Sequence, residues 1–234
     1  MFKHSFYFGI IVLGDNMAIK ENLDITKIEE ELTNRLESAG INISFDDELV
    51  HNNALNIYLT SYGLDTRYGF LNSYDSIISI LKNHKVAIIN NAKLESEDRT
   101  TADVAKSEMK KNGIEAKVID LNHSRFKISD YDALYLSGGE PKYLMDAIIN
   151  NNLYDDFNEF FKNGGLVIGQ SAGAMIFNHE YLDTSTGTLR VQDNGFDFND
   201  KIIVPHFEHL PNNIVKSLPK DILVIKDIDD LIKL

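Results

Sequence analysis

A serine stands between two glycines in the segment Gly169-Gln170-Ser171-Ala172-Gly173. The apolar run before it is typical of a strand, and the residues after it are typical of a helix. Small residues at both glycine positions allow a sharp turn, which would expose the Ser171 hydroxyl and direct the backbone N–H of Ala172 to the same point. The pattern therefore predicts a nucleophile elbow with one donor for an oxyanion. An ordinary strand-glycine-helix junction is the alternative interpretation.

A second pair of glycines follows another short apolar run, in the segment Leu136-Ser137-Gly138-Gly139. Glycines at a strand end allow a tight turn and leave a backbone N–H unobstructed. Gly139 is therefore a candidate for a second oxyanion donor beside Ala172. A simple tight turn before a helix is the alternative. Neither the Gly-x-Gly-x-x-Gly pattern nor the Walker lysine pattern is present, so phosphate binding is disfavoured.

A serine nucleophile needs a base, and His206 is the best placed of the 7 histidines. It directly follows the β-branched run 202–204, which predicts that it lies at the end of a strand. The other histidines stand in the N-terminal part or beside predicted turns, and we interpret them as surface residues. His209 could pair with His206 on a metal ion, but no second cluster of ligands accompanies them. We therefore expect no metal and no cofactor.

The composition excludes several classes of partner. With 36 acidic and 23 basic residues, the net charge of −13 disfavours nucleic acid and an anionic membrane as partners. The absence of cysteine excludes disulfides, thiolate catalysis and thiolate-ligated zinc, and it favours a cytoplasmic location. The apolar stretch from Phe6 to Gly14 is too short for a membrane span and lacks a signal-peptide cleavage pattern.

The chain divides into two parts. Residues 1–53 are predicted to form an N-terminal extension with an amphipathic helix from Asp24 to Ala39, and residues 54–234 a catalytic domain. In the domain, predicted strands cover 56–60, 85–90, 115–121, 133–136, 166–168, 202–204 and 222–226, and predicted helices cover 74–83, 98–112, 142–149 and 153–163. This alternation predicts an α/β fold with a doubly wound, mostly parallel sheet and active groups at the carboxyl ends of its strands.

Four segments resemble the peptidase E family of serine peptidases, which is related to the cyanophycinases. They are Ser-Gly-Gly at 137–139, Gly-Gln-Ser-Ala-Gly-Ala at 169–174, Asn-Gly-Phe at 194–196 and Val-Pro-His-Phe at 204–207. The resemblance extends from Asn56 to about Lys226. It implies a class I glutamine-amidotransferase-like fold in which serine replaces the nucleophilic cysteine. Members described as dipeptidases cleave after an N-terminal aspartate.

The resemblance also implies a role for each candidate site residue. Ser171 is the nucleophile, His206 is the base, and Gly139 with Ala172 forms the oxyanion hole. His206 would take the Ser171 proton, the alkoxide would attack a carbonyl carbon, and water would later release the acyl group.

The acidic member of the triad stays open at the level of sequence. Asp183 fits by its position between the serine and the histidine, with Asp193 and Asp197 as competitors. Some relatives carry a glutamate near their last strands, where this chain has Asp227. Asp183 is the preferred candidate and Asp227 the alternative.

These observations predict a serine peptidase that hydrolyses short peptides in the manner of a dipeptidase. A small peptide is the expected substrate, and a homodimer is left open. The alternatives are an α/β-hydrolase-type esterase, which shares the order Ser-Asp-His, and a non-catalytic amidotransferase-like binding module. Residues 178–192 differ in length from the family, so the preferred first residue of the substrate stays open at the level of sequence. Arg190, or a lysine from elsewhere, is expected to bind a substrate carboxylate.

Overall fold

The computed structural model describes residues 55–69, 71–93, 100–183, 190–210, 212–219, 221–226 and 231–234. The predicted N-terminal extension, its helix and Asp227 lie outside these residues. Among the helices that are described, none is long and apolar enough to cross a membrane.

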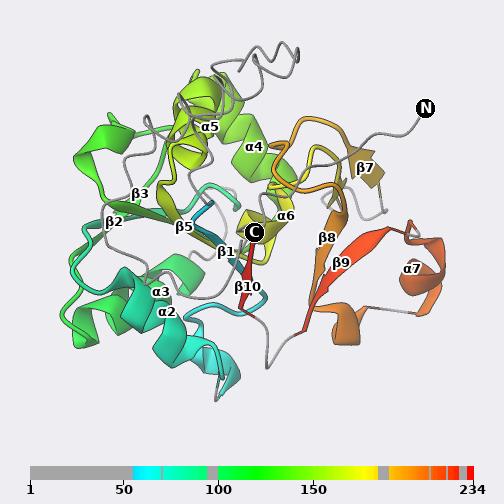
Figure 1. The fold of residues 1–234 in the computed structure, drawn as a ribbon, viewed down its shortest axis with the longest axis horizontal. Helices are drawn as coiled ribbons and strands as arrows, with labels where there is room; N and C mark the ends of the chain where they lie inside the picture. Colours follow the sequence, from blue (N-terminus) through cyan, green and yellow to red (C-terminus); the bar gives the residue numbers. More distant parts are fainter. Residues whose placement is uncertain are drawn as a thin grey trace, which may run out of the picture. The chain divides into compact units, whose positions relative to one another are not determined.

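A six-stranded sheet lies at the centre of the described domain, in the order β10-β1-β5-β4-β2-β3 (Figure 1). Its strands are β1 (Ile57–Thr60), β2 (Val86–Ile89), β3 (Ala116–Ile119), β4 (Ala133–Leu136), β5 (Leu166–Gln170) and β10 (Ile232–Lys233). The pairings among β1 to β5 are parallel, and only the short β10 pairs antiparallel, with β1. The predicted mostly parallel α/β sheet is confirmed.

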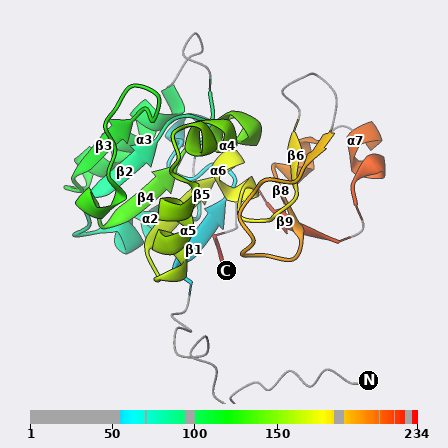
Figure 2. The same ribbon diagram turned by 90° about the horizontal axis from the view of Figure 1, so that it is seen from above.

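Helices cover both faces of this sheet. They are α2 (Tyr74–Leu81), α3 (Thr100–Lys111), α4 (Pro141–Asn150), α5 (Tyr154–Lys162) and α6 (Ala172–Met175). α2 and α3 lie on one face, and α4, α5 and α6 lie on the other (Figure 1, Figure 2). In β4, Ala133 and Tyr135 join the core under α2 and α3, whereas Leu134 and Leu136 join the opposite core. Successive side chains of a strand point to opposite faces, so β4 contributes to both cores. A parallel sheet that is covered by helices on both faces is doubly wound.

Four phenylalanines pack the segment after α6 against α5. Phe157 and Phe161 of α5 are fully buried, as are Phe177 and Phe196. The ring centroid of Phe161 lies 5.1 Å from that of Phe177 and 5.0 Å from that of Phe196. Burying each ring stabilises the fold by roughly 1.5–3 kcal/mol. Phe196 is the last residue of the Asn-Gly-Phe segment that resembles the peptidase E family. This phenylalanine packs in the core and does not line the pocket at Ser171.

The last predicted strands do not join the central sheet. β8 (Ile202–Pro205) and β9 (Ile222–Ile225) pair in parallel with each other, and α7 (Asn212–Ser217) lies between them in sequence (Figure 1). β6 (Tyr181–Asp183) and β7 (Arg190–Gln192) form an antiparallel pair. The sequence did not predict β6, β7 or β10, because strands of two or three residues carry too little alternation to be recognised.

Candidate active site

Ser171 joins β5 to α6 in a backbone conformation that L residues rarely adopt, with φ of 49° and ψ of −109°. Its N–H donates a hydrogen bond of 2.8 Å to the carbonyl of Thr60, at the end of β1. A Cβ on Gly169 would lie 2.6 Å from the Gly173 carbonyl oxygen, and a Cβ on Gly173 would lie 2.3 Å from the Leu136 carbonyl oxygen. Both glycines are therefore required for the close approach of α6 to the strands, as the sequence predicted.

The structure brings His206 to Ser171. The Nε2 atom of His206 lies 3.1 Å from Oγ of Ser171, within hydrogen-bond distance. His206 directly follows β8, and its backbone is left-handed, with φ of 54° and ψ of 32°. Its N–H donates a hydrogen bond of 3.1 Å to Oγ of Ser61, which in turn donates one of 3.0 Å to the carbonyl of Ile225 in β9. Ser61 therefore ties the β8–β9 pair to the end of β1.

The Gly138-Gly139 loop lies next to Ser171. A Cβ on Gly138 would be 3.3 Å from Cβ of Ser171. Gly139 has φ of 148°, and a Cβ there would lie 2.3 Å from the carbonyl oxygen of Ala92. Ala172 is the first residue of α6, where N–H groups have no acceptor within the helix. Of the two candidate oxyanion donors, Ala172 thus directly follows Ser171, and Gly139 directly follows Gly138, which lies beside Ser171.

Asp183 is buried at the end of β6, with a relative exposure of 1%. Its Oδ2 accepts a hydrogen bond of 2.9 Å from Nε2 of Gln192. β6 packs against β8, the strand that carries the histidine, through Leu182. The competing carboxylates of Asp193 and Asp197 are exposed. Burial therefore distinguishes Asp183 from the two competitors.

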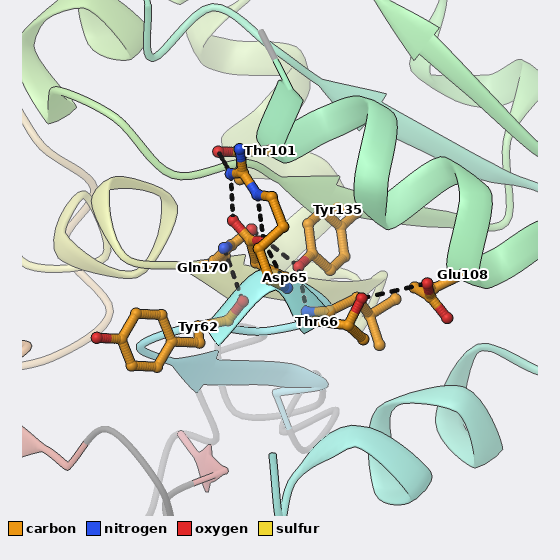
Figure 3. Close-up of polar contacts among 9 residues, drawn as sticks. Tyr62, Asp65, Thr66, Thr101, Glu108, Tyr135 and Gln170 are labelled. Carbon is orange, nitrogen blue, oxygen red and sulfur yellow. Dashed lines mark hydrogen bonds and ion pairs between the residues drawn. The ribbon is translucent and has the colours of Figure 1, made fainter. Parts of the chain in front are cut away.

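A buried polar network, which the sequence analysis missed, holds the loop after β1 against the site (Figure 3). The hydroxyl of Tyr135 accepts a hydrogen bond of 2.9 Å from the N–H of Leu64 and donates one of 2.9 Å to Oε1 of Gln170. Nε2 of Gln170 donates a hydrogen bond of 2.7 Å to the carbonyl of Tyr62. Burial raises the pKa of Tyr135, so that its hydroxyl stays protonated. The one indication of this network in the sequence is that a tyrosine and a glutamine, Tyr135 and Gln170, stand within otherwise apolar strands.

A pocket of about 370 Å³ opens at the site and is lined by residues that include Ser171, His206, Gly139 and Lys93. Lys93 is thus a cationic side chain at the pocket, on a loop that the sequence analysis did not single out. Arg190 is exposed on β7, opposite Asp183, and is not among the residues lining this pocket.

A comparison with known protein families matches residues 57–228 to Peptidase family S51. The chain belongs to this family. Membership of family S51 makes it a serine-type peptidase and confirms the resemblance to peptidase E. It does not support the esterase alternative.

Solved structures also resemble this S51 chain. One is a candidate peptidase E protein from Listeria monocytogenes EGD-e, with a TM-score of 0.54 and 17% identity over 77% of this chain and 95% of that chain. Another is a peptidase from an acI-B1 Actinobacterium, with a TM-score of 0.54 and 22% identity over 76% of this chain and 82% of that chain. At these identities the likeness concerns the fold. A search of curated proteins finds no match.

Proposed function

We propose that the chain is a dipeptidase-like serine peptidase that cleaves short peptides through an acyl-enzyme formed on Ser171. The observation that carries this proposal is the distance of 3.1 Å between Nε2 of His206 and Oγ of Ser171. A serine hydroxyl is a weak nucleophile until a neighbouring base accepts its proton. The strained backbone of Ser171 is the geometry expected of a nucleophile elbow, which holds Oγ exposed at the end of a strand.

In the proposed reaction, His206 takes the Oγ proton while Oγ attacks the scissile carbonyl carbon. The oxyanion that forms would be stabilised by the N–H groups of Gly139 and Ala172, each contributing on the order of 10²-fold to the rate. His206 then gives its proton to the leaving amine, and the acyl group stays on Ser171 until water releases it.

Asp183 is the proposed third member of the triad. It lies between the serine and the histidine in sequence, it is buried, and its strand packs on the strand of the histidine. A buried carboxylate of this kind fixes the tautomer of the imidazole and stabilises the imidazolium. Asp227 remains the alternative.

The size of the pocket supports a small substrate. A volume of about 370 Å³ is at the lower end of the range for small-molecule sites and offers no room for a folded protein. Lys93 is the lysine that we propose to attract a substrate carboxylate, in place of Arg190.

A library of dipeptides with varied first residue tests this proposal. The parent protein should hydrolyse a subset of the library, and Ser171→Ala and His206→Ala should each reduce kcat at least about 10³-fold. Ser107→Ala provides a matched control, because this serine is exposed on α3 and does not line the pocket. If Ser171→Ala keeps more than about a tenth of the parent activity, catalysis by this serine is wrong.

A further inference from the structure

In the proposed reaction, the leaving amine and the carbonyl oxygen of the substrate contact different parts of the pocket. The inference below concerns the part that contacts the leaving amine, and it rests on the proposed function. A base that accepts the serine proton later delivers it to the leaving amine, so the leaving group must pass within hydrogen-bond reach of His206. The scissile carbonyl oxygen points instead to Gly139 and Ala172. Side chains packed on the imidazole therefore line the leaving-group end of the pocket.

Two tyrosines occupy that end. The ring of Tyr62 packs against the imidazole of His206, with centroids 4.7 Å apart and an interplanar angle of 58°. Tyr68 stacks on Tyr62, with centroids 4.3 Å apart and an interplanar angle of 26°. Both side chains line the pocket. Tyr68 is nevertheless 61% exposed, so stacking leaves most of its ring surface open to a ligand.

The turn that carries Tyr68 is firmly anchored. Asp65 is buried, and its carboxylate accepts hydrogen bonds from Nε and Nη2 of Arg67 at 2.7 Å and 2.6 Å. The N–H of Tyr68 donates a hydrogen bond of 3.2 Å to the carbonyl of Asp65. Thr66 donates one of 3.3 Å to the buried Glu108 of α3 (Figure 3). An exposed aromatic ring on so rigid a turn is preorganised for contact.

The backbone of Tyr62 is anchored to the residue before the nucleophile. Its carbonyl accepts the hydrogen bond from Gln170, the residue before Ser171, and its ring points away from this network (Figure 3). The backbone of Tyr62 is therefore held by β5, the strand that ends directly before Ser171, and the ring of Tyr68 stacks on that of Tyr62.

The cationic side chain of the pocket comes from a different loop than the two tyrosines. Lys93 follows Ala92, whose carbonyl oxygen accepts a hydrogen bond of 2.7 Å from the N–H of Glu140, directly after Gly139. Lys93 is therefore next to the loop of the proposed oxyanion donor Gly139 and lines the pocket.

We propose that Tyr62 and Tyr68 form the subsite for the residue after the scissile bond, and that this subsite takes a flat or bulky apolar side chain. Stacking on tyrosine favours phenylalanine, and apolar contact favours leucine. Glycine at this position has no side chain to contact the rings.

Dipeptides that share one efficient first residue and differ in the second test this proposal. With phenylalanine, leucine, alanine and glycine at the second position, the parent protein should show a kcat/KM for phenylalanine at least about tenfold above that for glycine. Tyr68→Ala should bring this ratio to within about threefold, whereas Tyr68→Phe, which keeps the ring, should preserve it. Ile149→Ala should leave both activity and ratio unchanged, because this side chain is 39% exposed on α4 and does not line the pocket.

Acyl transfer to an added amine measures the same subsite without relying on a variant. A methyl ester of the first residue acylates Ser171 and releases methanol, with the Oγ proton passing through His206 to the methoxy group. Phenylalanine amide or glycine amide then attacks the carbonyl of the acyl-enzyme. The C–Oγ bond breaks, the amide bond forms, and the amine proton passes through His206 to Ser171. Phenylalanine amide should capture the acyl group more efficiently than glycine amide at equal concentration.

The outcomes separate the subsite from the proposed function. Hydrolysis that depends on Ser171 but shows no dependence on the second residue, or a phenylalanine preference unchanged in Tyr68→Ala, overturns the subsite alone. A failure to hydrolyse any dipeptide of the library overturns the proposed function and the subsite with it.

Discussion

The backbone N–H of His206 donates a hydrogen bond of 3.1 Å to Oγ of Ser61, across 145 residues of sequence. Ser61 is buried at the end of β1 and also donates to the carbonyl of Ile225. The backbone of His206 is therefore held by the residue that directly follows β1 of the central sheet, although β8, the strand before His206, lies outside that sheet.

Ser61→Ala should consequently misplace the imidazole. We expect kcat for a good dipeptide to fall about tenfold with little change in KM, because a small displacement of a general base is costly. The free energy of unfolding should fall by about 1–2 kcal/mol, since a buried N–H loses its acceptor. Steady-state kinetics and urea unfolding measure the two effects. An unchanged kcat would contradict the positioning role.

Gly139→Ala should damage the proposed oxyanion hole. The added Cβ would lie 2.3 Å from the carbonyl oxygen of Ala92, at a φ of 148°, so the loop must move. We expect kcat to fall about 10²-fold. Gly113→Ala is the matched control, because Gly113 has φ of 73° but open space around its Cα. It should cost about 1 kcal/mol of stability and leave kcat unchanged. Equal losses of kcat in the two variants would refute a specific role for Gly139.

Tyr135→Phe should weaken the network that joins Gln170 to the loop after β1. The change leaves the N–H of Leu64 and Oε1 of Gln170 without their buried partner, at a cost of about 1–3 kcal/mol. Urea unfolding measures this loss. Tyr131→Phe, at a half-buried tyrosine outside the network, should cost less. The network is unimportant for stability if both variants unfold at the same urea concentration.

Glu108 should make the stability of the fold depend on pH. The hydrogen bond from Lys111 is the main cause that lowers the pKa of Glu108 below its ordinary value of 4.5, and Tyr74 and Thr66 donate to it as well. Because the folded-state pKa is the lower one, the ionised carboxylate stabilises the fold above pH 4.5 and loses this contribution as the pH falls through the folded-state value.

Glu108→Gln should therefore lower the Tm at pH 7, by an amount equivalent to about 1 kcal/mol, and the difference from the parent should shrink in acid. Thermal unfolding of the parent and the variant, from pH 7 down to below pH 4.5, measures this difference in Tm. Glu115→Gln, at an exposed glutamate, should show little difference at any pH. If the difference in Tm between the parent and Glu108→Gln grows as the pH falls, the ionised Glu108 carboxylate does not stabilise the fold.

The sequence was sufficient to predict the five parallel strands of the central sheet and the meeting of Ser171 with His206. Within the central sheet and its helices, the predicted strands β1 to β5 and helices α2 to α5 agree with the observed ones to within two residues, because each is long enough to show a clear period. The glycines around Ser171 predicted the close approach of α6, since only glycine permits it.

The remaining features depend on long-range contacts that no local pattern encodes. Ser61 and Tyr135 act through partners 145 and 35 residues away, and neither belongs to a recognisable motif. Lys93 reaches the pocket only because the loop after β2 folds beside Gly139. The separate pairing of β8 and β9 was not predicted, because periodicity indicates a strand but not its neighbours.

Covalent labelling with a fluorophosphonate tests the proposed nucleophile most directly, because the reagent reacts much faster with an activated serine than with an ordinary hydroxyl group. After labelling of the parent protein and proteolysis, mass spectrometry should find one modified site, at Ser171. Ser171→Ala should take up no label, and His206→Ala should react at least about 10²-fold more slowly. Label on a different serine, or a folded protein that hydrolyses dipeptides while Ser171 stays unmodified, would contradict catalysis by Ser171 and His206.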